Sequence, residues 1–320
     1  MDSQRFEFDY WLPFTARLPL RLGLALNLLR GSINYRFDRE WRSYAVGQPY
    51  IKERVLSAMA TLSGWRSESV KVTSRAQARF AFAAVEEWQA QLIISNRLDD
   101  LAFKGYEHFV QLPRQMIIAT MHFDSPMLGL AQLGRWGHDL SLLTSNIVED
   151  HRVHPSVRNF FAAKYQAMSA CWPTGACAHK ETALGRFVQS AKRGASLAVL
   201  CDVPANNAAT PGLHSSKSVP VPFLGANRCV APAVFRFAET LRLPVVGMVC
   251  QRLSAKNYQF VFSEIIDYNN RRNLADKLYG FFTDQIQQRP QAWWASDLLD
   301  SYRIVGQEDM QKLTAVDITT

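Results

Sequence analysis

The fold is decided by the stretch Met116-Ile-Ile-Ala-Thr-Met-His-Phe-Asp-Ser-Pro-Met-Leu-Gly129. Its first six residues form a short apolar run bounded by Pro113 and His122, which is typical of a buried parallel strand. The following Asp124-Ser125-Pro126 has the form of a helix start, with a side-chain acceptor at the cap and proline at the first helical position. A strand that leads directly into a helix predicts an α/β core beginning after about residue 105.

Further apolar runs alternate with helical patterns along the rest of the chain. We expect strands at 140–144, 196–200, 245–249 and 260–265, and helices at 159–167, 181–192, 231–241 and 273–288. Strands that alternate with helices predict the α/β class, with a mostly parallel central sheet flanked by helices.

The N-terminal third has a different pattern, which divides the chain into an N-terminal helical, membrane-associating region (1–100) and an α/β domain (101–320). Apolar residues recur at helical spacing in 50–62 and 80–92, and the polar, basic segment 64–74 between them predicts a loop. The leucine-rich segment Leu18–Arg30 has two interpretations: an anchor lying in a membrane interface, or an ordinary helix packed on the main domain.

Composition limits the partners and the compartment. The chain has 320 residues, 48% of them hydrophobic, and a formal net charge of +8, which favours an anionic partner. An acidic carrier protein or an anionic membrane surface fits better than nucleic acid, because no nucleic-acid-binding motif is present. No secretory signal or spanning segment is evident, so we expect a cytoplasmic protein.

Five cysteines without a disulfide-framework spacing indicate reduced thiols in a cytoplasmic protein. They are Cys171, Cys177, Cys201, Cys229 and Cys250. Cys171, Cys177 and His179 match no zinc spacing, so we expect no metal, and nothing indicates a cofactor.

His122 is the leading candidate for chemistry. It directly follows an apolar strand, and ligands of open α/β sheets bind at the carboxyl ends of strands, so it is a candidate general base, although a structural histidine is the alternative. If residues 122–124 stay extended, Asp124 lies on the same side and can orient the imidazole, while its other role is a helix cap. Ser125 is not in a Gly-x-Ser-x-Gly context, so we assign it to substrate binding rather than to a nucleophile.

Two later segments contribute further candidate substrate-binding residues. Asp202 ends the apolar run Leu197-Ala-Val-Leu-Cys201 and is followed by Asn206 in a Gly/Ser/Thr-rich loop, which indicates a site wall or, equally, a carboxylate that bonds loop amides. Arg228 precedes a helix that begins near Pro232 and can hold an anionic group.

Taken in order, these segments resemble the bacterial lipid A biosynthesis acyltransferases, the lauroyl/myristoyl transferase family of the wider lysophospholipid acyltransferase superfamily. The similar segments cover about 200 residues. They are Phe103-Lys-Gly-Tyr-Glu-His108, the strand ending at His122-Phe123, Leu184 to Asp202, Val221-Pro-Phe-Leu-Gly225, the helix from Ala231, Leu243-Pro-Val-Val-Gly-Met-Val249, and Pro290-Gln-Ala-Trp-Trp294 with Arg303.

The resemblance implies a glycerolipid acyltransferase-like fold and a peripheral location on the inner face of the cell membrane. It also implies transfer of a fatty acyl group from an acyl carrier protein or coenzyme A thioester to a hydroxyl or amine of a small-molecule or lipid acceptor. His122 would be the base that deprotonates the acceptor.

One departure from the family concerns the acid of its His-x4-Asp/Glu motif, because this chain has Met127 at that position. Asp124 is the nearest substitute. The change leaves three functions open: an acyltransferase with a different acceptor, an acyl-thioester hydrolase or condensation enzyme of secondary metabolism, and a non-catalytic lipid-binding relative.

Overall fold

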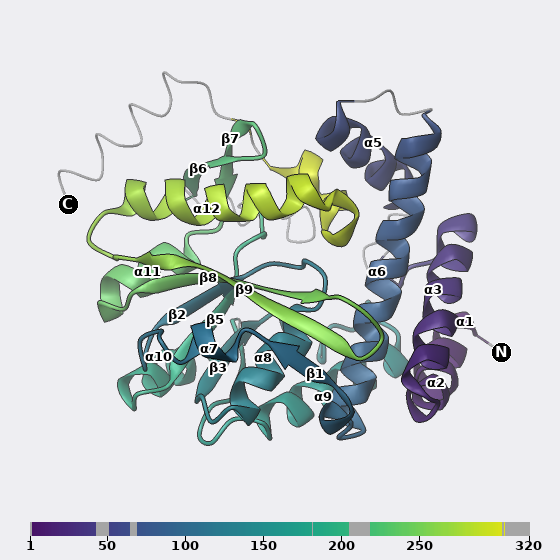
Figure 1. Cartoon of the computed structure of the whole chain (residues 1–320), viewed down its shortest axis with the longest axis horizontal. Coiled ribbons are helices and arrows are strands. Elements are labelled where there is room, and N and C mark those ends of the chain that lie inside the picture. The colour runs from purple at the N-terminus through teal and green to yellow at the C-terminus, as the bar shows by residue number, and fades with distance from the viewer. Residues whose placement is uncertain are drawn as a thin grey trace.

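The computed structural model describes residues 2–42, 51–64, 69–180, 182–204, 218–302 and 304. Its centre is a seven-stranded sheet with the order β1-β9-β8-β2-β5-β3-β4 (Figure 1). Every neighbouring pair runs parallel except β8 and β9, which are antiparallel. The strands are β1 (Ala102–Lys104), β2 (Ile117–Thr120), β3 (Leu140–Thr144), β4 (Cys177–His179), β5 (Ser196–Leu200), β8 (Val245–Arg252) and β9 (Asn257–Ile266). The predicted α/β class with a mostly parallel sheet is confirmed.

The strand predictions agree best at the centre of the sheet. β3 and β5 have the predicted bounds, and β8 and β9 extend beyond theirs. The short edge strands β1 and β4 were not predicted, and the proline-bearing segment after residue 218 forms a separate hairpin of β6 (Val219–Phe223) and β7 (Ala226–Val230). Strands buried on both faces carry long apolar runs, so these are the strands that the sequence identifies most clearly.

Helices cover both faces of the sheet. Successive side chains of a strand point to opposite faces, so a strand with an apolar run gives both faces apolar side chains. In β2, Ile118 belongs to one hydrophobic cluster while Ile117 and Ala119 belong to the other. The first cluster includes α8 (Pro126–Arg135) and α9 (Pro155–Ser169). The second includes α10 (Leu184–Lys192), α11 (Ala233–Leu241) and α12 (Arg271–Gln288). The short elements are the 3-10 turns η2 (Leu98–Asp100), η3 (Pro290–Ala292) and η4 (Ser296–Ser301), and the helix α7 (Tyr106–Phe109).

An N-terminal helical layer packs beside this sheet, as predicted. It contains α1 (Ser3–Arg5), the π-helical turn η1 (Phe6–Trp11), α2 (Leu12–Arg17), α3 (Leu20–Phe37), α5 (Ile51–Ser63) and α6 (Val70–Ile94). Helix α6 lies between the sheet and α3 (Figure 1). The predicted loop at 64–74 is wrong for its last five residues, because α6 begins at Val70, and residues 65–68 lie outside the described ranges. The start of α6 carries the exposed polar side chains of Lys71, Thr73 and Ser74. The division into regions 1–100 and 101–320 stays a prediction.

Close contact between α3 and α6 depends on glycine. A side chain at Gly31 would place its Cβ 2.4 Å from the Cα of Ala81, and one at Gly23 would lie 3.0 Å from the indole of Trp88. The two helices therefore approach backbone to backbone. No helix in the described part of the chain is both long and apolar enough to cross a membrane.

Candidate functional site

The candidate site is built by two neighbouring parallel strands. β2 and β5 pair in a register that sets Thr120 opposite Leu200. His122 lies two residues beyond the end of β2, and Asp202 lies two residues beyond the end of β5. Equal spacing from paired strand ends brings the two side chains together at the carboxyl edge of the sheet, which is where open α/β sheets bind their ligands.

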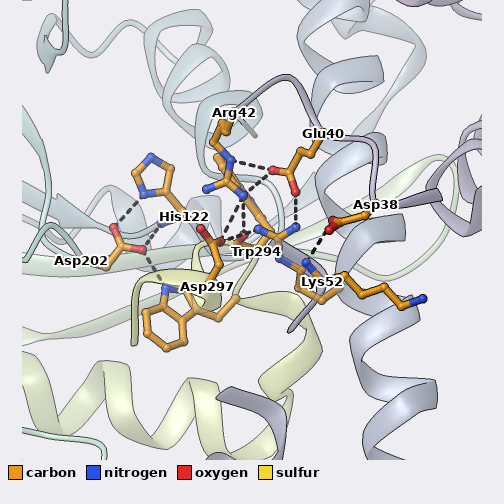
Figure 2. A network of polar contacts seen from close by, with 10 residues as sticks. Asp38, Glu40, Arg42, Lys52, His122, Asp202, Trp294 and Asp297 are labelled. Carbon is orange, nitrogen blue, oxygen red and sulfur yellow. Dashed lines mark hydrogen bonds and ion pairs between the residues drawn. The ribbon is translucent and has the colours of Figure 1, made fainter. Parts of the chain in front are cut away.

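Asp202 holds His122 through two hydrogen bonds. Nδ1 of His122 lies 2.9 Å from Oδ1 of Asp202, and the backbone N–H of His122 donates to Oδ2 at 2.9 Å. The indole Nε1–H of Trp293 donates to the same Oδ2 at 2.8 Å, and Figure 2 shows how Asp202 faces His122. The carboxylate is therefore surrounded by donors and fixed in orientation.

The ionisation of Asp202 decides the tautomer of His122. Asp202 is fully buried, and burial alone would raise its pKa, but the adjacent His122 and the hydrogen bonds from His122 and Trp293 bring the pKa below its ordinary value. An ionised carboxylate only accepts, so Nδ1 must donate and the lone pair of the neutral ring lies on Nε2. That arrangement is the one a general base needs.

The second ring nitrogen is free to act. The side chain of His122 is 22% exposed, and among the residues that the structure describes, Nε2 has no hydrogen-bond partner. The ring of Trp294 stands edge-on to the imidazole, with the centroids 4.6 Å apart and the planes at 71°. The backbone N–H of Trp294 also donates to the carbonyl of His122 at 3.0 Å. The paired tryptophans therefore hold both members of the dyad.

No described serine or cysteine contacts His122 in a way that would make it a nucleophile. Cys201, the nearest thiol in sequence to Asp202, is buried, and its burial together with the Asp202 charge raises the pKa of the thiol. A thiol with a raised pKa is a poor nucleophile. The dyad is thus suited to removing a proton from a molecule that comes from outside the protein.

The predicted role of Asp124 is wrong. Its carboxylate accepts hydrogen bonds from the backbone of Arg252 at 3.1 Å and from Ser125 Oγ at 2.9 Å, and it pairs with Arg289 at 3.0 Å, so it contacts neither His122 nor the first turn of α8. The reason is the backbone: Asp124 has a φ of 55°, in the left-handed region. The alternation that would place it beside His122 ends there.

The other predicted site residues fall in different places. Ser125 begins α8 as its N-cap, but it is fully buried between Gln89 and Asp124, which leaves no surface for a substrate. Arg228 lies in β7, where it is buried and donates to the carbonyl of Phe223 at 3.1 Å, and burial lowers its pKa. Asn206 and Arg303 lie outside the described residues. Of the predicted residues that the structure describes, only Asp202 is brought to His122, as its partner rather than as a site wall.

An ion cluster beside the dyad was not predicted. Arg79 of α6 is fully buried and pairs with Glu40 at 2.5 Å and with Asp297 of η4 at 2.6 Å. Arg42 binds the same two carboxylates and also donates to the backbone carbonyl of Trp294 at 3.3 Å (Figure 2). Two arginines balance two carboxylates, which is the condition for burying such charges. Because the members of this ion cluster are far apart in sequence, no local sequence pattern predicts that they meet.

Metal binding finds no support in the described ranges, because no three His, Cys, Asp or Glu side chains there are arranged to hold an ion.

The chain matches no protein-family model, and a comparison with curated proteins likewise gives no significant match.

Proposed function

We propose that this chain is an acyltransferase that moves a fatty acyl group from a carrier-protein or coenzyme A thioester to a hydroxyl of its acceptor, with His122 as general base. The observation that carries the proposal is the His122–Asp202 pair at the carboxyl edge, with the His122 side chain 22% exposed. The order of sequence segments that resembles the lipid A acyltransferases supports the choice of thioester and hydroxyl as the two substrates.

In the proposed reaction His122 moves one proton in each direction. Nε2 takes the proton of the acceptor hydroxyl while the oxygen attacks the thioester carbonyl carbon, which forms a tetrahedral oxyanion. The intermediate collapses with cleavage of the C–S bond, and the departing sulfur receives the proton from the imidazolium. Asp202 stabilises that imidazolium, and direct transfer is consistent with the lack of a nucleophile bound to His122 among the described residues.

The proposed location is cytoplasmic and peripheral, on the inner face of the cell membrane. Helix α3 buries the polar residues Asn27, Arg30 and Asn34 and exposes several apolar ones. Asn27 donates to Thr15 of α2, and Arg30 binds Glu87 of α6. Together with η1 and α2 it exposes Phe6, Tyr10, Phe14, Leu22, Leu29, Ile33 and Phe37, each between 41% and 58% exposed.

We call these seven side chains the apolar face. The exposed Arg17, Arg21, Arg36 and Arg39 come from the same helices and the turn that follows them. Apolar side chains accompanied by arginines are the pattern of a helix that lies in an anionic membrane interface. An acceptor that resides in a membrane would reach the enzyme from this side of the chain.

The catalytic proposal is tested by His122→Ala in purified protein. Thiol release from an acyl-thioester is followed with and without hydroxyl acceptors, and the ester product is identified by mass spectrometry. His108→Ala is the matched control, because His108 is an exposed histidine on α7. Ester formation that persists at the wild-type rate in His122→Ala would falsify the mechanism. Free fatty acid as the sole product of the wild-type protein would show that it catalyses hydrolysis instead of acyl transfer.

The membrane proposal is tested by co-sedimentation with vesicles of phosphatidylcholine, with and without phosphatidylglycerol. We expect Leu29→Gln/Ile33→Gln to reduce binding to the anionic vesicles. Val70→Gln is the matched control, since Val70 is an apolar residue that is 81% exposed on α6, outside the apolar face. Equal binding by the double variant and the wild type would exclude the apolar face as the contact.

A further inference from the structure

Arg42, which follows α3, contacts Trp294, whose ring packs against the imidazole of His122. We propose that Arg42 is a positioning residue that fixes the imidazole of His122 by holding Trp294 against it. The inference rests on the proposed function for its effect on rate. Its structural part, the coupling of Arg42 to Trp294 and to His122, is measurable without any substrate.

The contacts of Arg42 show how it holds Trp294. Its guanidinium donates to the carbonyl of Trp294 at 3.3 Å and lies 5.9 Å from the centre of the indole ring. The same guanidinium bonds Glu40 through Nε at 2.6 Å and Asp297 through Nη2 at 3.2 Å. One arginine therefore ties the backbone and the ring of Trp294 to carboxylates from both ends of the chain.

Trp294 in turn limits the one motion that Asp202 leaves to the imidazole. The bond from Nδ1 to Asp202 fixes one point of the ring, and rotation about that bond would swing Nε2 away from its position. The indole ring, whose centroid lies 4.6 Å from the imidazole centroid with the planes at 71°, stands in the path of that rotation. If Trp294 moves away, Asp202 still fixes the tautomer of His122, but Nε2 no longer points in a fixed direction.

The chemistry of the cluster explains why arginine is needed at position 42. Burial opposes the charged form of Arg42, but the neighbouring Asp297 and Glu40 hold its pKa above its ordinary value, so the guanidinium stays charged. A lysine would also be charged, but its single ammonium cannot present the planar fork that reaches two carboxylates and a carbonyl together. The fully buried Arg79 keeps both carboxylates in place from the other side.

The experiment compares Arg42→Lys and Arg42→Gln with Arg39→Gln. Arg39 is the matched control, because it is an exposed arginine three residues away whose cation–π contact is with Phe37. In isotope-labelled protein, nuclear Overhauser contacts between the Trp294 and His122 rings should weaken in both Arg42 variants and persist in Arg39→Gln. Thermal unfolding identifies any variant that fails to fold. If Arg42→Gln does not fold, the ring contacts of Arg42→Lys, which retains the charge, test the inference.

Kinetics give the second measurement. We expect kcat to fall about 10- to 100-fold in the folded Arg42 variants, as for other small misplacements of a catalytic group, with KM for the thioester unchanged. Added guanidinium ion should partly restore kcat in Arg42→Gly, since the Arg42 side chain is 20% exposed.

The two measurements separate the two ideas. Ring contacts that are unchanged in both Arg42 variants would overturn the inference, whatever the activity. Weakened ring contacts in a protein that never transfers acyl groups would support the positioning role and refute the proposed function instead.

Discussion

Replacing Asp202 by asparagine is the most direct test of the dyad, because the side chain keeps its size and loses its charge. Oδ2 of Asp202 accepts hydrogen bonds from the indole N–H of Trp293 and from the backbone N–H of His122. An amide that keeps those two bonds on its oxygen must turn its NH2 toward Nδ1. Nδ1 then accepts, and the neutral ring carries its proton on Nε2, where the lone pair is required.

The size of the effect follows from the charge and the tautomer together. The 2.9 Å contact between Nδ1 and Oδ1 brings the imidazolium and carboxylate charges to about 4 Å, where unit charges attract by about 4 kcal/mol at an effective dielectric constant of about 20. Because about 1.4 kcal/mol is tenfold in rate, this loss alone lowers kcat by about 10³. The same substitution in a serine-protease triad lowers kcat by about 10⁴. We therefore expect a decrease of about 10³ to 10⁴ in Asp202→Asn.

The assay is thiol release from the acyl-thioester in the presence of the acceptor, normalised to folded protein. Asp124→Asn is the matched control, since Asp124 is also a buried aspartate, two residues from His122, but pairs with Arg289. It should cost about 1–3 kcal/mol of unfolding free energy, as for a weakened buried polar group, and keep turnover close to wild type. If Asp124→Asn lost as much turnover as Asp202→Asn, or if Asp202→Asn lost little, the assignment of the dyad would be refuted.

Three further predictions concern neighbouring parts of the structure. Trp293→Phe removes the indole donor to Asp202, so kcat should fall about tenfold, the effect of one lost hydrogen bond of about 1.5 kcal/mol, and normal turnover in the folded variant would contradict it. Burial raises the pKa of Glu87 from 4.5 to about 7 against the opposing charge of Arg30, so this group adds stability below pH 4.5 that is lost as the pH rises to about 7. The loss is at most about 3 kcal/mol, and denaturant unfolding of Glu87→Gln across that range should lack this slope, whereas an unchanged slope would place the titration elsewhere. Gly31→Ala should lower the melting temperature of the chain, because its Cβ would collide with the backbone of α6 at Ala81, and an unchanged melting temperature would show that α3 can move away freely.

The parts of the fold that the sequence predicts are those with local signals. β3 and β5 were predicted with the correct bounds because a strand buried on both faces is a largely apolar run. β4 has three residues and lies at the edge of the sheet, so it offers no comparable run. The start of α6 was missed because Lys71, Thr73 and Ser74 near its N-terminus are polar and exposed, a composition that is also typical of a loop.

The site shows the same limit. His122 and Asp202 were each recognised as polar residues that follow a strand, but their meeting depends on β5 pairing with β2, and strand order is set by contacts far apart in the chain. Asp124 was misassigned because a left-handed backbone residue cannot be anticipated from the alternation of a strand. The ion cluster of Glu40, Arg79 and Asp297 joins residues more than 200 positions apart, which no local pattern reveals.

Met127, where the similar family has an acid, takes on a different meaning in this structure. The residue is the second of α8 and is 6% exposed in the hydrophobic cluster of that face of the sheet, so its side chain serves packing. In the proposed mechanism the base does not lack a carboxylate, because Asp202 supplies one from the adjacent strand with Nδ1 already bonded. Asp202 lies two residues beyond β5, and the backbone hydrogen bond from Cys201 to Thr120 holds the residue that precedes it. Met127 is therefore compatible with the proposed role of His122 as a base.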